Sequence, residues 1–334
     1  MDQQPGMQIK IETSDSQIWY VAQRSAEITA QLIKHDQVNI HLNSEGPCAT
    51  SLGLYDLLDN IVAITNTSKQ RIKIHTCNQV EHHSEYIICR YPSDKGIDTL
   101  QDKLRKSSHQ HKDIKKYFGS FVGHGNRIRL ALSSYLYTHY KDKTLQSYHT
   151  DVTNPYFREF LGIEDLMFYQ YSDETIKSAL TLLENAPLKI DSISSYPILF
   201  NTGKVYDILD YYDNIFVDIV NQTYFTGNTF FLDDKFWRSI VTKTPFIVQG
   251  PQHFLDNLKK LGFKTFDQWW DEGYSEDPPD FQATMIIKVL DDIGGWPMEK
   301  VQQVYHDMAP ILEHNYNRFL SLTADDFKKV FKYD

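Results

Sequence analysis

The stretch FVGHGNRIRLAL, residues 121–132, combines residue types that suit phosphate binding. A strand pattern leads through Gly123 into a turn, and the first turn of the following helix pattern carries Arg127 and Arg129. Unpaired backbone N–H groups at a helix start and guanidinium forks both favour a phosphate group. The spacing does not complete G-x-G-x-x-G, because Ile128 occupies the last glycine position. A glycine turn with two solvent-facing arginines is therefore an open alternative.

An acidic pair followed by a lysine marks a second helix start. Asp233 and Asp234 directly precede Lys235, and Trp237 and Arg238 follow in the same helix pattern. A carboxylate at this place can accept hydrogen bonds from both hydroxyls of a ribose, and Lys235 can reach a diphosphate. The same carboxylates could simply cap the helix and favour its dipole, which is the structural alternative.

The third candidate is the loop that follows the strand pattern in NIHLNSEGPCATSLGLYDLLD, 39–59. His41 lies in the strand pattern and Glu45 in the loop, just before a helix pattern begins. A carboxylate or an imidazole in such a loop can accept a proton from an attacking hydroxyl. The alternatives are a solvent-exposed Glu45 and a His41 that is satisfied within the core.

Strand and helix patterns alternate along the first part of the chain, which predicts an α/β fold with parallel sheets. The expected strands are 7–13, 37–43, 61–65, 71–76 and 86–91, and the expected helices are 25–35, with Ser25 as N-cap, and 51–61. A second series follows with strands at 116–123, 144–151, 213–222 and 245–250 and helices at 127–140, 234–244 and 254–263. Pro310 should interrupt the final helix, 298–320. We expect three parts: an N-terminal αβ domain, 1–115; a C-terminal αβ domain, 116–300; and a helical segment, 301–334.

Residues 220–276 resemble the C-terminal half of GT-B-type glycosyltransferases, especially a group from bacteriophages and bacteria. Its pattern reads roughly TEK-T-[WF]-[KR]-P-I … PF-I-V-x-G … L-x-x-L-G-F-K-T-F … W-W-D-E-x-Y, and the α1,3-fucosyltransferases carry a related T-E-K-L pattern. This chain reads DDKFWRSI, PFIVQG, LKKLGFKTF and WWDEGY at the corresponding positions. It departs from the pattern where Asp233–Asp234 replace Thr–Glu, Ser239 replaces Pro, and Gln222 stands where an upstream Glu is common.

The resemblance implies a GT-B-like fold, in which two Rossmann-like αβ domains face a central cleft, with 1–115 as the acceptor-side domain and 116–300 as the nucleotide-sugar-binding domain. It implies that Asp234 holds the donor ribose and Lys235 the diphosphate, with Arg127 and Arg129 in a phosphate turn. It also implies a glutamate in the acceptor-side loop, here Glu45, and inversion at the anomeric carbon. No cofactor is expected beyond a nucleotide-diphosphate sugar as co-substrate.

Metal-dependent chemistry is not expected. The sequence has no D-x-D signature, and the pairs His82–His83 and His109/His111 lack helical i, i+4 partners. Trp269–Trp270 with Asp271–Glu272 is interpreted as packing at a helix end. The three cysteines lack C-x-x-C spacing, and no apolar run or leader pattern is present, so a reduced, cytoplasmic setting is expected, the host cytoplasm if the protein is viral.

The charge distribution bears on the acceptor. The chain of 334 residues has a net charge of −10, yet residues 101–129 hold eight Lys/Arg and two Asp. Such a segment can follow a nucleic-acid backbone. Phage glycosyltransferases of similar type modify hydroxymethylated cytosines in DNA, which makes duplex DNA one acceptor hypothesis. The alternatives are a saccharide acceptor, as in bacterial enzymes that build surface polysaccharide, and a non-catalytic nucleotide-binding relative.

Overall fold

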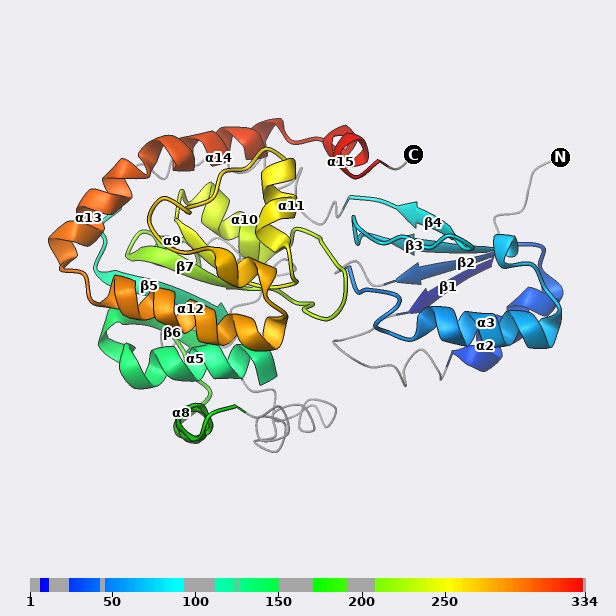
Figure 1. Cartoon of the computed structure of the whole chain (residues 1–334), viewed down its shortest axis with the longest axis horizontal. Coiled ribbons are helices and arrows are strands. Elements are labelled where there is room, and N and C mark those ends of the chain that lie inside the picture. Colours follow the sequence, from blue (N-terminus) through cyan, green and yellow to red (C-terminus); the bar gives the residue numbers. More distant parts are fainter. Residues whose placement is uncertain are drawn as a thin grey trace. The chain divides into compact units, whose positions relative to one another are not determined.

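The computed structural model describes residues 7–11, 24–42, 46–92, 112–123, 125, 127–149, 171–190 and 208–332 (Figure 1). The chain divides into two compact units. Unit 1 comprises Met1–Ile97, Thr223–Asp233 and Leu322–Asp334, and unit 2 comprises Asp98–Gln222 and Asp234–Ser321. Unlike the expected ranges, this division groups two later parts of the chain with the N-terminal residues. They are the segment Thr223–Asp233 and the C-terminal residues that contain helix α15 (Ala324–Phe331). The chain therefore passes from one unit to the other four times.

Unit 1 is built on a parallel sheet in the sequential order β1-β2-β3-β4. The strands are β1 (Met7–Ile11), β2 (Val38–Leu42), β3 (Ile72–Thr76) and β4 (Ile87–Arg90), and the helices between them are α2 (Ser25–Lys34) and α3 (Leu54–Thr65). Each helical crossover moves in the same direction along the sheet, so right-handed connections put α2 and α3 on the same face (Figure 1). Alternating apolar residues of the strands, such as Ile40 and Ile74, pack against these helices.

Two local expectations for unit 1 are wrong. The segment 61–65 is the last part of α3 and not a strand, because the apolar positions Leu54, Leu58 and Ile61 continue one helical face onto the sheet. The N-cap of α2 is Arg24 and not Ser25, which is the first helical residue. Short apolar runs of this kind fit either element, and only the packing decides between them.

Unit 2 contains a second parallel sheet, whose order β6-β5-β7-β8 reverses direction between β5 and β7. Its strands are β5 (Lys116–Val122), β6 (Thr144–Tyr148), β7 (Ile215–Asn221) and β8 (Phe246–Gln249). The crossover through α5 (Arg127–His139) moves one way and that through α10 (Asp234–Val241) moves the other way. Right-handed connections therefore place α5 and α10 on opposite faces of the sheet (Figure 1). The two parallel α/β units confirm the expected fold class and are consistent with a GT-B-like division.

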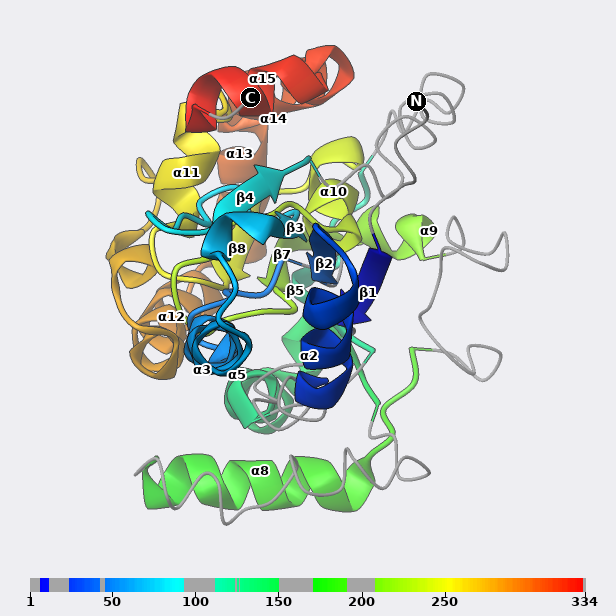
Figure 2. The same ribbon diagram turned by 90° about the vertical axis from the view of Figure 1, so that its right-hand side faces the viewer.

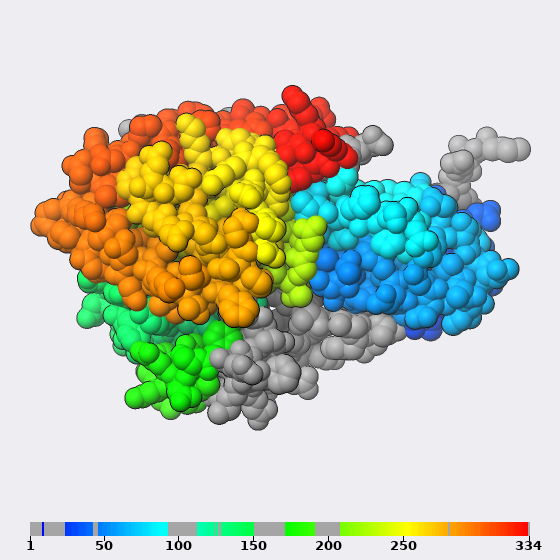
Figure 3. Space-filling view, viewed as in Figure 1, coloured from blue at the N-terminus to red at the C-terminus, as the bar shows by residue number. Residues whose placement is uncertain are grey.

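The remaining helices of unit 2 cover this sheet. They are α8 (Asp173–Asn185), α9 (Leu209–Tyr212), α11 (Phe254–Lys260), α12 (Pro279–Gly294), α13 (Met298–Asp307) and α14 (Ala309–Ser321). Figures 1 and 2 show α8 crossing beneath α5, and residues of both helices share a core cluster that includes Leu130 and Leu182. Side chains of α12 and α13, in orange, form much of the face of unit 2 seen in Figure 3.

The expected break at Pro310 is confirmed. Helix α13 ends at Asp307, α14 begins at Ala309, and Pro310 is its second residue. Proline is tolerated there because the first N–H groups of a helix have no partner within the helix. Across the described ranges, no helix combines the length and apolar character required to cross a membrane.

Candidate functional site

The reversal of strand order in unit 2 defines the first place to look for a ligand. In open α/β sheets, ligands bind outside the carboxyl ends of the strands where the order reverses. Here those ends are Val122 of β5 and Asn221 of β7. Helix α5 begins five residues after β5 ends, and α10 runs from this edge back to β8, so both helices start at the carboxyl edge of the same sheet.

The turn after β5 is shaped for close approach. Gly123 follows the strand, and the N–H of Gly125 donates to the carbonyl of His149, 3.0 Å away. A Cβ at Gly125 would lie 2.7 Å from Cζ of Tyr148, so no side chain fits here. The turn therefore brings its backbone close to the end of β6 and leads directly into Arg127, the first residue of α5. The side chain of Arg127 lies outside what the structure describes.

Arg129 is buried and does not project into solvent. The residue is 5% exposed, and its Nη2 donates to the carbonyl oxygen of Gln222 at 2.5 Å. The side chain of Gln249, at the end of β8, donates to the carbonyl of Ile128 at 3.2 Å. These bonds fasten the start of α5 to the ends of β7 and β8. For Arg129 the alternative of a solvent-facing side chain is therefore wrong.

The start of α10 gathers three predicted residues into one charged cluster. Oδ2 of Asp234 accepts from Nη2 of Arg238 at 2.9 Å, and Nζ of Lys235 lies 3.7 Å from Oδ1. Burial works against ionisation of Asp234, but the charges of Lys235 and Arg238 outweigh it and hold the pKa of this carboxyl below its ordinary value. Asp234 is therefore a carboxylate near neutral pH.

This cluster remains accessible to a ligand. The side chains of Asp234 and Lys235 keep 21% and 23% of their surface exposed. A carboxylate offers about four lone-pair sites, and Arg238 occupies one of those on Oδ2. Asp234 can thus accept hydroxyl donors while Lys235 presents a positive charge beside it. Asp233, which precedes Asp234 in the chain, is buried and is grouped with unit 1.

A buried carboxylate that the sequence analysis missed lies behind this cluster. Asp218, in the middle of β7, is 3% exposed and accepts from Oγ of Ser239 at 2.7 Å. Burial raises the pKa of Asp218 to about 6, against the opposing effects of the Ser239 hydrogen bond and the Arg238 charge. Arg238 thus interacts electrostatically with both Asp218 and Asp234. The available signal was a single acid within the apolar run IFVDIVN.

A second buried charge, Lys112, is electrostatically linked to the same carboxylate. Its Nζ donates to the carbonyl of Tyr212 at 2.9 Å and to the hydroxyl of Thr244. Burial lowers the pKa of Lys112 to about 7, and the charges of Asp213 and Asp218 act in the opposite direction. Because Thr244 precedes β8, this lysine anchors the amino end of the sheet, away from the candidate site.

In unit 1 the structure describes one of the two predicted catalytic residues. Glu45 lies outside the described residues. His41 is half-buried on the face of β2 opposite to the helices, and its ring stacks on His75 of β3 at 4.2 Å. Burial, the His41 ring and Lys73 lower the pKa of His75. His41 is therefore not a core histidine, and the proton-accepting roles of His41 and Glu45 stay predictions.

Glu81 was also missed and is the most buried carboxylate among the described residues of unit 1. It is 4% exposed, and Oε2 accepts from the N–H of Ala49 at 2.9 Å and from Nδ2 of Asn78 at 3.1 Å. Oε1 accepts from the hydroxyl of Tyr55 at 2.9 Å. Burial raises the pKa of Glu81. Nothing in the polar sequence VEHH distinguishes such a residue from an exposed one.

One group of possible metal ligands occurs in the described part of unit 2. The ligand atoms of His253, Asp256 and Glu276 lie within 4.8 Å of one another, and all three residues are exposed. Nδ1 of His253 already forms an ion pair with Glu276 at 2.6 Å. In unit 1, the ring of His83 packs on Tyr55 at 4.2 Å, while His109 and His111 lie outside the described residues.

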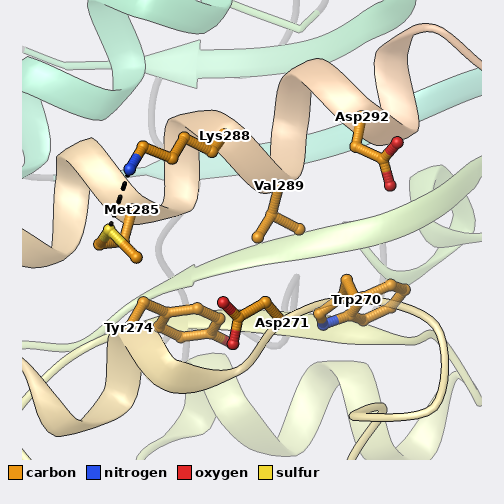
Figure 4. Close-up of a pocket in the computed structure, with 7 residues that line it drawn as sticks. All are labelled: Trp270, Asp271, Tyr274, Met285, Lys288, Val289 and Asp292. Carbon is orange, nitrogen blue, oxygen red and sulfur yellow. Dashed lines mark hydrogen bonds between the residues drawn. The ribbon is translucent and has the colours of Figure 1, made fainter.

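A pocket of about 140 Å³ lies between α12 and the loop that carries Trp270 (Figure 4). Trp270 and Asp271 come from this loop, and Lys288 and Asp292 come from the helix. Trp270 is 5% exposed, and its ring packs on Phe266 with centroids 5.4 Å apart. The expected packing role of Trp270 is therefore confirmed, although the residue lies in a loop and not at a helix end. Trp269 is exposed.

Comparisons with known proteins give one match. No family model matches the chain, and no curated protein matches it either. Among solved structures, a glycosyltransferase from Rickettsia africae ESF-5 is similar over 95% of this chain and 83% of that chain, with 9% sequence identity and a TM-score of 0.34. At this level of similarity, function has to be argued from the chain's own residues.

Proposed function

We propose that the protein is a glycosyltransferase that moves a sugar from a nucleotide-diphosphate donor to a hydroxyl acceptor. The observation that carries this proposal is the pair of helix starts at the carboxyl edge of one parallel sheet. One start follows a tight glycine turn and has Arg127 as its first residue. The other carries the ionised Asp234 beside Lys235. A ribose needs an acceptor for its hydroxyl hydrogen bonds, and a diphosphate needs positive charge and N–H donors. The two helix starts supply these groups.

Each residue has a definite task in this proposal. Asp234 accepts the ribose hydroxyls, held in place by Arg238, and Lys235 binds the diphosphate with Arg127 and the N–H groups of α5. Arg129 holds the end of β7 through Gln222, so its contribution to a phosphate site is one of positioning. Asp233 precedes this site in the chain and belongs to unit 1.

The reaction needs no metal in this scheme. The acceptor oxygen forms a bond to the anomeric carbon as the bond from that carbon to the diphosphate breaks. Lys235 and Arg127 stabilise the negative charge that develops on the leaving diphosphate. The acceptor proton passes to Glu45, with His41 as the alternative proton acceptor. The expected stereochemical outcome is inversion.

Donor binding can be tested separately from turnover. A panel of ADP, CDP, GDP and UDP should raise the melting temperature of the wild-type protein, by an amount that grows with nucleotide concentration. Lys235→Ala should abolish most of this shift, whereas the exposed Lys264→Ala in the same unit should retain it. Equal shifts in both variants would contradict the placement of the diphosphate, and no shift in the wild type would contradict the proposal as a whole.

For the acceptor we propose duplex DNA that contains 5-hydroxymethylcytosine. This choice rests on the basic segment 101–129, of which residues 101–111 lie outside the described residues. The protein, a panel of nucleotide sugars and such DNA are incubated, and the digested nucleosides are weighed. A mass gain of one pentose or hexose on cytosine supports the proposal. Transfer to a saccharide alone would favour the saccharide enzyme, and nucleotide binding without transfer to either would indicate a non-catalytic relative.

A further inference from the structure

The segment Thr223–Asp233, here called the strap, is the part of unit 1 that ends immediately before α10, the helix whose start carries Asp234 and Lys235. Within unit 1 it is held by buried hydrogen bonds. The hydroxyl of Thr229 donates to the carbonyl of Gly46, and the N–H of Gln79 donates to the carbonyl of Phe230 at 2.8 Å. The Phe231 ring packs so closely over Gly46 that a Cβ there would lie 2.8 Å from its Cδ1. The strap is therefore fixed at several points.

Asn78 is the residue on which these contacts converge. It is fully buried, directly after β3. Its Oδ1 accepts from the N–H of Phe230 at 2.9 Å and from that of Val80 at 3.2 Å. Its Nδ2 donates to the carbonyl of Asn228 at 2.9 Å and to Oε2 of Glu81 at 3.1 Å. Both lone pairs and both protons of the amide are thus used, which only asparagine can do at this position.

The partner carboxylate extends this network to the loop after β2. Glu81 accepts from the N–H of Ala49, and Thr229 of the strap holds the carbonyl of Gly46. Gly46 directly follows Glu45, the predicted proton acceptor. One buried network therefore holds the strap and the Gly46–Ala49 backbone together inside unit 1. An amide that is fully satisfied in a buried network specifies a single geometry, because any other leaves a polar group unpaired.

The strap is joined covalently to the predicted donor site. Only three residues separate Phe230, which Asn78 holds, from Asp234, which starts α10. We propose that Asn78 is a positioning residue that, by holding Phe230, sets the first turn of α10 in the geometry required for donor binding and transfer. This inference rests on the proposed function.

The matched control is Asn315 in unit 2. It is also a buried asparagine, and it clamps a loop through two bonds to the backbone of Lys264, each 2.8 Å long. Both Asn78→Ala and Asn315→Ala should lower the melting temperature, and Asn78→Ala should lower it at least as much, because it loses four hydrogen bonds and Asn315→Ala loses two. Only Asn78→Ala should raise the donor KM and lower kcat, each by roughly tenfold, a factor that corresponds to about 1.4 kcal/mol.

A double-mutant cycle separates positioning from general destabilisation. If Asn78 acts through the start of α10, its effect on nucleoside diphosphate affinity should largely disappear in a Lys235→Ala background, because the contact that it positions is already absent. Effects that simply multiply, or an Asn78→Ala variant that behaves as Asn315→Ala does, would overturn the inference while leaving the proposed function intact.

A milder variant keeps the test decisive if Asn78→Ala does not fold. Thr229→Val preserves the shape of the side chain and removes only the hydroxyl bond to Gly46. It should raise the donor KM in the same direction by a smaller factor. Unchanged kinetics in folded Thr229→Val would overturn the inference, and absence of nucleotide binding by the wild type would overturn the proposed function with it.

Discussion

The two parallel sheets have four described strands each but use their carboxyl edges differently. In unit 1 the strand order is sequential, so α2 and α3 share one face and no reversal opens the edge between neighbouring strands. Two polar residues follow β3 at that edge, Asn78 and Glu81. Their side chains form hydrogen bonds that hold loops in place. In unit 2 the order reverses between β5 and β7, and the two helix starts there carry charges that keep exposed surface.

The two sheets also differ in how far the side chains on their faces are buried. The second face of the unit 1 sheet presents half-buried polar side chains. Among them, Nε2 of His75 lies 3.1 Å from Oδ1 of Asn39. In unit 2 every residue of β7 is buried, and the one charged group within that strand, Asp218, is bonded to Ser239. Under the proposed function, this contrast matches donor binding by unit 2 and proton transfer by the polar groups of unit 1.

The sharpest test of this division of labour is the proton acceptor of unit 1. Glu45→Gln should lower turnover by about a hundredfold or more, because a glutamine cannot accept the acceptor proton. Nucleoside diphosphate affinity should stay unchanged, since the donor residues belong to unit 2. Steady-state kinetics and thermal shifts measure the two quantities separately. Full activity in Glu45→Gln would transfer the role to His41, and a loss of nucleotide affinity would break the division itself.

The buried charge of β7 predicts a pH dependence specific to unit 2. The pKa of Asp218 is about 6 in the folded protein, above its ordinary value, so the folded state binds the proton more tightly than the unfolded state does. The stability from this group is complete below the ordinary pKa and is lost as the pH rises through about 6. Relative to wild type, Asp218→Asn should therefore gain up to about 3 kcal/mol between pH 4 and pH 7.

Chemical denaturation at several pH values measures this difference. The matched control is Asp36→Asn, an exposed aspartate of unit 1, which should show a flat difference across the same range. A flat difference for Asp218→Asn as well would mean that the surrounding charges cancel the effect of burial.

The smallest expected effect compares one glycine from each unit. Gly125→Ala should destabilise the protein by about 2 kcal/mol, because the new Cβ overlaps the Tyr148 ring. Gly53→Ala should cost about 1 kcal/mol, because its φ of 65° lies in the left-handed region. Gly125→Ala should also weaken nucleotide binding. Equal effects on binding would show that the turn after β5 is not part of the donor site.

The secondary structure near the candidate site followed from local patterns. The alternation of Val38, Ile40 and Leu42 and the continuous apolar run of β7 both encode strands, and Pro310 encodes a helix break through its missing N–H. The prediction for 61–65 was wrong because four apolar residues followed by Thr65 suit a strand as well as a helix end. The start of α10 was predictable because acidic residues favour the first turn of a helix, and Asp234 is its first residue.

The sequence by itself determined the α/β class, most strands and helices, and the charged residues at the two helix starts, because these depend on neighbours within a few positions. Only the tertiary structure decided that Arg129 is buried against Gln222, that Asp218 lies behind Arg238, and that the strap belongs to unit 1 through Asn78. Asn78 and Phe230 are 152 positions apart, and no pattern of neighbouring residues predicts a hydrogen bond over that separation. Strand order has the same origin, since the position of β7 beside β5 is chosen by packing over the whole unit.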